Sequence, residues 1–265
     1  MNCMKEYAAL MIDLKKSKSY STESRNKLQQ KILETIQKLN TLFSTTITKE
    51  VEFSAEDEIQ GLFSSPMAAY LYLRFFQLLT FPLELHAGIG LGSWDIVIEN
   101  SSSTAQDGPV YHHARKAIEE SKKNLEYFSL FYSERNEDRV INSLINAYEV
   151  LLKKQSKYQA ELHLMTEFLY PISIENVLSE NAMIEFLKDS EQSNWKSEII
   201  DGREVEELFY IKLGKRRGLA TQLSELLESS RQSIEKSLKV GNIYEMRNLV
   251  FAILEILKNM KGEKE

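Results

Sequence analysis

Four acidic side chains in the N-terminal half are placed where they could hold a metal ion. Asp13 ends the apolar run YAALMID, and Glu56, Asp57 and Glu58 form the turn between the apolar segments TITKEVEF and EIQGLF. If these segments are neighbouring strands, the two turns converge at one end of a sheet. Carboxylates placed in this way can hold a divalent cation against a triphosphate. The alternative is that all four acids are solvated at the tip of a hairpin.

Basic residues follow the first of these acids directly. The segment LKKSKSYS carries Lys15, Lys16 and Lys18 after Asp13. A lysine-rich loop beside a carboxylate can cradle a phosphate group. The alternative is a charge run that is simply solvated.

The composition and the N-terminus predict a cytoplasmic protein without a membrane segment. The 265 residues are 43% hydrophobic and 27% charged, which is ordinary for a globular protein with one large domain or two. No apolar run approaches the roughly 20 residues that a membrane helix needs. The N-terminus MNCMKEYAALMID has no signal cleavage site, and the single Cys3 excludes an intrachain disulfide and suits a reducing compartment.

Charge is distributed unevenly along the chain. The net charge is −6, which weighs against a polyanion-binding role for the molecule as a whole. Residues 134–211 are strongly acidic, whereas residues 212–247 carry eight basic and four acidic side chains. A basic island inside an acidic half predicts a local anion-binding surface.

The elements of the first half follow the order strand, helix, hairpin, helix, strand. We expect strands at 7–13, 46–53, 58–63 and 126–133, and helices from Thr22, from Pro66 and over 109–123. Within 83–98 we expect a strand that runs into a turn at Gly92-Ser93 and a short return strand. This order predicts an α+β domain over residues 1–134, with a ferredoxin-like antiparallel sheet and helices on one face. The hairpin then lies beside the first strand, which should bring Asp13 and Asp57 together.

The alternating glycines of GIGLG match no phosphate-loop pattern and predict close packing of a helix on a strand.

From residue 135 the strand signals stop. Leucine and isoleucine recur at steps of three and four residues up to Pro171, and the last apolar helix follows Asn242. These patterns predict an all-α domain over residues 135–265.

A pair of short helices at 219–240 resembles a helix-turn-helix. Ser230 can cap the second helix, which leaves short polar and basic side chains outward at its start. Such residues can reach the edges of bases in the major groove and the phosphates of DNA. The alternative is a plain helical hairpin that joins two copies into a homodimer. The predicted core residues are Leu223, Leu227, Ile234 and Leu238, and the predicted DNA-binding residues are Arg231, Gln232, Ser233 and Lys236.

Five short motifs occur in a specific order: MID…SK with Asp13, Ser17 and Lys18, then Arg25, DEIQGL, GIGLG and DGPVYHHAR. In this order the chain resembles the SatD family of bacterial proteins, closely over about residues 7–133 and more loosely over the C-terminal third. The family usually has Gly-Asp-Glu at the hairpin tip, where this chain has Glu56-Asp57-Glu58.

SatD proteins are similar in turn to class III nucleotide cyclases and polymerase palm domains. The resemblance implies two metal ions, Mg²⁺ or Mn²⁺, at Asp13 and Asp57. It also implies a nucleotide ligand near Ser17, Lys18, Arg25 and Glu58. Cyclases stabilise the transition state with an Asn and, four residues later, an Arg. Those two catalytic positions are Tyr111 and Arg115 here, so the Arg is kept and the Asn is not.

Three classes of function remain open on the sequence alone. The leading hypothesis is a non-enzymatic regulator, in which a cyclase-like domain binds a nucleotide or metal and a helix-turn-helix binds DNA. The second is a metal-dependent nucleotide cyclase or nucleotidyltransferase that uses Asp13 and Asp57. The third is a non-catalytic interaction protein whose ancestral site has decayed. The common zinc-binding and serine-hydrolase motifs are absent from the sequence.

Overall fold

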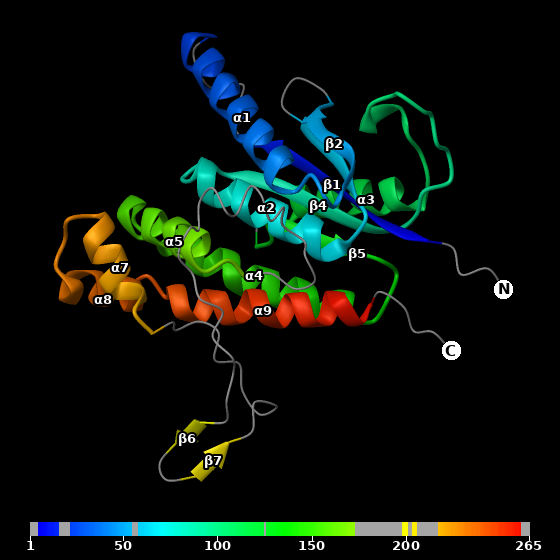
Figure 1. Cartoon of the computed structure of the whole chain (residues 1–265). Coiled ribbons are helices and arrows are strands. Elements are labelled where there is room, and N and C mark those ends of the chain that lie inside the picture. The colour runs from blue at the N-terminus through cyan, green and yellow to red at the C-terminus, as the bar shows by residue number, and fades with distance from the viewer. Residues whose placement is uncertain are drawn as a thin grey trace.

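The computed structural model of the chain (Figure 1) describes residues 5–15, 22–54, 58–124, 126–172, 198–200, 203–205 and 217–260. The predicted site residues Ser17, Lys18 and Asp57, and Glu56 of the same turn, lie outside these ranges.

A five-stranded sheet forms the centre of the N-terminal half. Its order is β2-β3-β1-β4-β5, and β1 is antiparallel to both of its neighbours. The central strand is apolar on both faces, since all residues from Ala8 to Ile12 are buried. The strands are β1 (Glu6–Leu14), β2 (Ile47–Phe53), β3 (Glu58–Phe63), β4 (Leu85–Ser93) and β5 (Ser129–Tyr132).

The prediction of an antiparallel sheet is wrong for its last strand. β5 pairs with β4 in parallel, so the sheet is mixed. The connection between them contains a helix, α3 (Pro109–Lys123), that packs on the sheet. A crossover of this kind returns the chain in the same direction, whereas a short hairpin reverses it.

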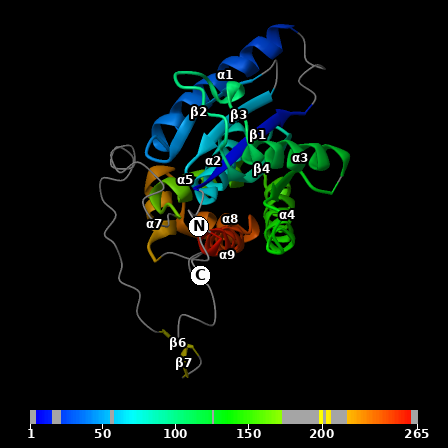
Figure 2. The same ribbon diagram turned by 90° about the vertical axis from the view of Figure 1, so that its right-hand side faces the viewer.

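Helices cover both faces of the sheet, and not one face as predicted. On one face, Leu10 and Ile12 of β1 join the main core with α1 (Thr22–Leu42) and α2 (Pro66–Thr80). On the other face, Ala9 and Met11 pack against α3 in a smaller core. Figure 2 shows β1 running between α1 and α3. Because successive strand residues point to opposite faces, a strand that is apolar at every position needs a cover on each.

Glycines let α3 approach the sheet closely. Cβ atoms added to Gly88 or Gly90 of β4 would overlap the backbone of α3 at Ala114. This confirms that GIGLG serves helix-on-strand packing. Both Pro66 and Pro109 open their helices, as predicted.

The C-terminal half adds a further layer outside α2. Its long helices are α4 (Asp138–Lys154), α5 (Lys157–Leu169) and α9 (Ile243–Asn259). In Figure 1, α2 lies between the sheet and α9, and only Gln77 and Leu79 of α2 are not fully buried. The main core therefore contains side chains from both sides of the predicted domain boundary at residue 134.

A helix pair, a hairpin and a single 3-10 turn complete the described part of the chain. Helices α7 (Leu219–Leu226) and α8 (Arg231–Val240) share a second apolar core with α5 and α9. Strands β6 (Glu198–Ile200) and β7 (Arg203–Val205) form a hairpin that the sequence patterns did not predict, so the expectation of an all-α C-terminal region is not confirmed. A single turn of 3-10 helix, η2 (Ser103–Ala105), lies in the loop before α3.

Candidate functional site

The register of the sheet brings three polar side chains to one rim. Asp13 is the Cα partner of Glu58 on β3 and of His86 on β4. The Asp13 carboxylate forms an ion pair with Lys122 from the last turn of α3. Asp13 thus lies beside the strand of the predicted hairpin, and its carboxylate is paired with a cationic side chain.

Glu58 is held by the guanidinium of Arg115. Two parallel hydrogen bonds of 2.6 Å join Arg115 Nη1 and Nη2 to the two carboxylate oxygens of Glu58. These bonds lower the pKa of Glu58, and a further bond from Ser54 acts in the same direction. Glu58 is therefore ionised at neutral pH, and a metal ion or nucleotide that bound it would have to displace Arg115.

His86 is the neutral member of the rim. It is half-buried, its ring stacks on Phe128 with centroids 6.4 Å apart, and its Nδ1 lies 3.4 Å from Ser121 Oγ. Burial, with a smaller effect of nearby Lys15, lowers the pKa of His86 to about 4. The imidazole is therefore uncharged at neutral pH, and its unprotonated nitrogen can accept a hydrogen bond.

The described rim residues do not form a metal-binding cluster. No group of three or more His, Cys, Asp and Glu side chains that could hold a metal ion occurs in the described ranges, which exclude Asp57. The two described carboxylates instead hold cations, Asp13 through Lys122 and Glu58 through Arg115.

The structure also describes Tyr111 and Arg25 of the predicted nucleotide site. Tyr111 is 5% exposed and packs in the small core between α3 and the sheet, with its hydroxyl 3.4 Å from Ser103 Oγ. Burial raises the pKa of Tyr111 to about 12, so the phenol stays protonated. Arg25 is half-buried in the first turns of α1. Of the predicted catalytic pair, only Arg115 reaches the rim.

The helix pair at the C-terminal end has the local structure that the sequence predicted. Ser230 Oγ accepts a hydrogen bond from the Ser233 backbone N–H at 3.2 Å and caps α8. Leu223, Ile234 and Leu238 are fully buried in the second core, and Leu227 packs against it. Glu228 in the turn has a φ of 48°, the left-handed conformation for which glycine is favoured.

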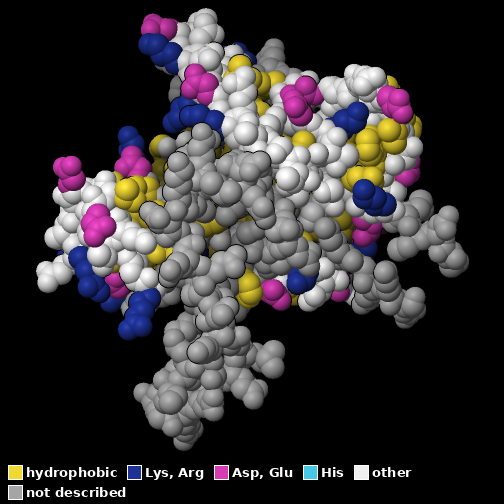
Figure 3. Space-filling view, viewed as in Figure 1, with side chains coloured by type: hydrophobic (Ala, Val, Ile, Leu, Met, Phe, Trp, Pro, Cys, Tyr) yellow, Lys and Arg dark blue, Asp and Glu magenta, His cyan; other side chains and the backbone are white. Residues whose placement is uncertain are grey.

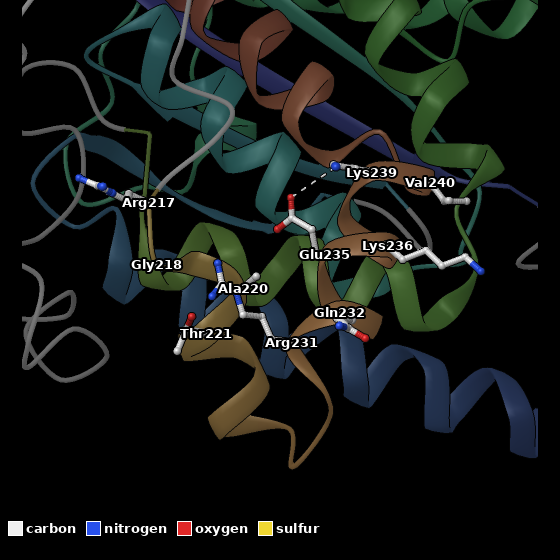
Figure 4. Close-up of a pocket in the computed structure, with 10 residues that line it drawn as sticks. All are labelled: Arg217, Gly218, Ala220, Thr221, Arg231, Gln232, Glu235, Lys236, Lys239 and Val240. Carbon is white, nitrogen blue, oxygen red and sulfur yellow. Dashed lines mark ion pairs between the residues drawn. The ribbon is translucent and has the colours of Figure 1, made fainter. Parts of the chain in front are cut away.

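A basic groove runs along this helix pair (Figure 4). Its volume is about 880 Å³, and it contains four basic side chains and one acidic side chain, Glu235, whose carboxylate lies 3.8 Å from Lys239 Nζ. Figure 3 shows Lys and Arg side chains gathered over α7 and α8, at the lower left. The groove is lined by Arg217, Gly218, Ala220, Thr221, Arg231, Gln232, Glu235, Lys236, Lys239 and Val240.

Three of the four predicted DNA-binding residues line this groove. Arg231, Gln232 and Lys236 are exposed within it, and Ser233 is exposed on α8 but is not among the lining residues. The helical period predicted these positions, since Ile234 and Leu238 fix the buried face of α8. Arg217 and Lys239 were not predicted, although Arg217 belongs to the basic segment GKRRG.

The comparisons with known proteins identify one family. The sequence model of the SatD family matches residues 7–194. The chain belongs to the SatD family. No curated protein and no solved structure matches it. The SatD match begins at β1 and ends before α7, so the basic groove lies outside the matched range.

No helix within the described part of the chain has both the length and the apolar content needed to cross a membrane.

Proposed function

We propose that this SatD-family protein is a DNA-binding regulator that contacts duplex DNA through the basic groove of α7 and α8. The observation that carries the proposal is the groove itself, which Arg217, Arg231, Lys236 and Lys239 line together with one acidic side chain, Glu235. Neutralisation of phosphates by such side chains supplies most of the non-specific affinity for DNA.

The dimensions and the cap of α8 suit entry into the major groove. Its ten residues are about 15 Å long, and a groove about 12 Å wide admits one α-helix. The four-residue turn from α7, with Glu228 in the left-handed conformation, is typical of a helix-turn-helix. The N-terminal residues of the second helix are those that contact bases in that motif.

The test is duplex binding measured by fluorescence anisotropy across a salt titration. We expect the double variant Arg231→Glu/Lys236→Glu to lose most of the affinity, because two attractive contacts become repulsive. The matched control is Lys31→Glu/Lys38→Glu, which makes the same change of charge on the exposed side of α1. Absence of salt-dependent binding by the natural protein, or equal losses in both variants, would refute the proposal.

A second function, nucleotide binding at the sheet rim, is supported by the register that sets Asp13 beside Glu58. The strand order β2-β3-β1-β4 supports a ferredoxin-like, cyclase-like assignment for this part of the sheet. In this hypothesis Mg²⁺ or Mn²⁺ would replace Lys122 and Arg115 at the carboxylates, and the released cations would face the phosphates. The proposal is one of binding and not of turnover.

Thermal unfolding with nucleoside triphosphates, with and without Mg²⁺, tests this second function. A ligand that binds only the native state raises the melting temperature. We expect a Mg²⁺-dependent rise that is lost in Asp13→Asn. If no nucleotide shifts the transition, the rim is a structural ion-pair cluster, and the third hypothesis of a decayed site applies to it.

A further inference from the structure

The side chains of the basic groove differ in where they point. Arg217 lies before α7 at one end of the groove, whereas Gln232 and Lys236 extend from the side of α8 that faces away from Arg217 (Figure 4). Lys239 lies 3.8 Å from Glu235 and is partly neutralised by it. The groove therefore presents a cation, Arg217, on the α7 side and two polar side chains on the outer side of α8.

Gln232 and Lys236 have the chemistry that recognises base edges. A glutamine amide both donates and accepts, and it matches N6 and N7 of adenine, while a lysine donates to O6 and N7 of guanine. The two residues are four positions apart, so they lie on one side of α8 about 6 Å apart along its axis. This separation is close to two base-pair steps of about 3.4 Å each.

Arg217 and Thr221 have the chemistry of backbone contacts. Both are exposed, and both line the groove from the α7 side. An arginine and a hydroxyl beside a groove bind phosphate oxygens of any sequence, which fixes the protein on DNA without selecting bases.

We infer, on the basis of the proposed function, that the groove separates base recognition from backbone binding. Gln232 and Lys236 determine the sequence preference over neighbouring base pairs in the major groove. Arg217 holds the phosphate backbone, with Thr221 beside it.

The test combines selection from a random-sequence duplex library with salt titrations on the full chain. We expect the natural protein to enrich a sequence preference. In Gln232→Ala the preference at one base pair falls by about 5- to 150-fold, the range for one bidentate base contact, and the salt slope is unchanged. In Arg217→Gln the preference is kept, and the salt slope falls by about 1.

The outcomes separate this inference from the function on which it rests. If the natural protein binds no duplex in a salt-dependent manner, the proposed function fails, and the inference fails with it. If it binds duplexes but Gln232→Ala selects the same sequences as the natural protein, or no sequence is preferred at all, only the inference is overturned. Both substituted residues are exposed, and an unchanged melting temperature for each variant confirms that the effects concern binding.

Discussion

At the scale of single residues, the most unusual feature is a carboxylate shared by two buried arginines. Glu167 of α5 accepts a hydrogen bond of 2.8 Å from Arg74 of α2 and pairs with Arg247 of α9. All three residues are at most 1% exposed. Burial alone would raise the pKa of Glu167, but Arg247 and Arg74 hold it at about 2. This one side chain therefore ties together helices from both halves of the chain.

We predict that Glu167→Gln destabilises the protein by about 3–5 kcal/mol at pH 7, because it leaves buried guanidinium groups without their counter-charge. Urea unfolding measures the loss, and Glu161→Gln on the exposed side of α5 is the control. Since the folded pKa of Glu167 lies below its unfolded value, its stabilisation is present above about pH 4.5 and is lost as the pH falls towards about 2. The difference between natural protein and variant should therefore shrink in acid; a loss no larger than that of the control would contradict the prediction.

Glu149 of α4 has the opposite dependence on pH. Its carboxylate accepts hydrogen bonds from the backbone and hydroxyl of Ser129 and from Gln77 Nε2. Burial nevertheless raises the pKa of Glu149 to about 7. A folded pKa above the unfolded value contributes stability below about pH 4.5, and that stability is lost as the pH rises through 7.

We predict that the natural protein loses up to about 3 kcal/mol between pH 5 and pH 8 relative to Glu149→Gln, which cannot ionise. Urea unfolding at several pH values on both proteins gives this difference, in which the effects of other titrating groups cancel. Parallel stability curves would show that Glu149 does not ionise differently in the folded and unfolded states.

At the scale of elements, α3 packs closely on β4. A Cβ on Gly90 would overlap the backbone of Ala114 and Val110, whereas a Cβ on Gly92 would lie 3.0 Å from the nearest atom. We predict that Gly90→Ala loses more stability than Gly92→Ala, at the upper end of the roughly 1–3 kcal/mol that overpacking costs. Denaturant unfolding compares the two variants within one strand. Equal losses would mean that α3 shifts freely on the sheet.

Local sequence signals predicted where most helices and strands lie. They did not predict the features that depend on long-range packing. Prolines marked the starts of α2 and α3, and Ser230 marked the start of α8, because each acts on its own turn of helix. The direction of β5 and the face covered by α3 depend on how the chain crosses the sheet, which no local pattern records. The exposed side of α8 could be predicted because Ile234 and Leu238, four residues apart, mark its buried side. By contrast, the pairing of Asp13 with Lys122 joins residues far apart in the sequence and needed coordinates.

At the scale of the whole molecule, α2 connects the two halves of the chain. Its sequence PMAAYLYLRFFQLLT is mostly apolar on every side, with Arg74 and Gln77 as exceptions, which is typical of a helix that is largely buried. Its inner side packs on the sheet, and its outer side packs against α5 and α9. The sheet and the long C-terminal helices therefore share one core, while α7 and α8 have a smaller core of their own.

This shared core predicts the behaviour of a fragment that ends at the predicted boundary. A chain of residues 1–134 keeps the sheet and α1 to α3 but loses α4, α5 and α9, so the outer side of α2 would be exposed to water. Phe75 and Phe76 of α2 are at most 1% exposed in the whole chain, and burial of one such side chain contributes about 1.5–3 kcal/mol. We expect the fragment to aggregate or to unfold without a cooperative transition, as measured by size-exclusion chromatography and thermal unfolding.

A chain of residues 1–260, which keeps every described helix, is the control. A monomeric 1–134 fragment with a sharp transition would show instead that the N-terminal half is an independent domain, and that the C-terminal helices dock on a surface that is stable without them.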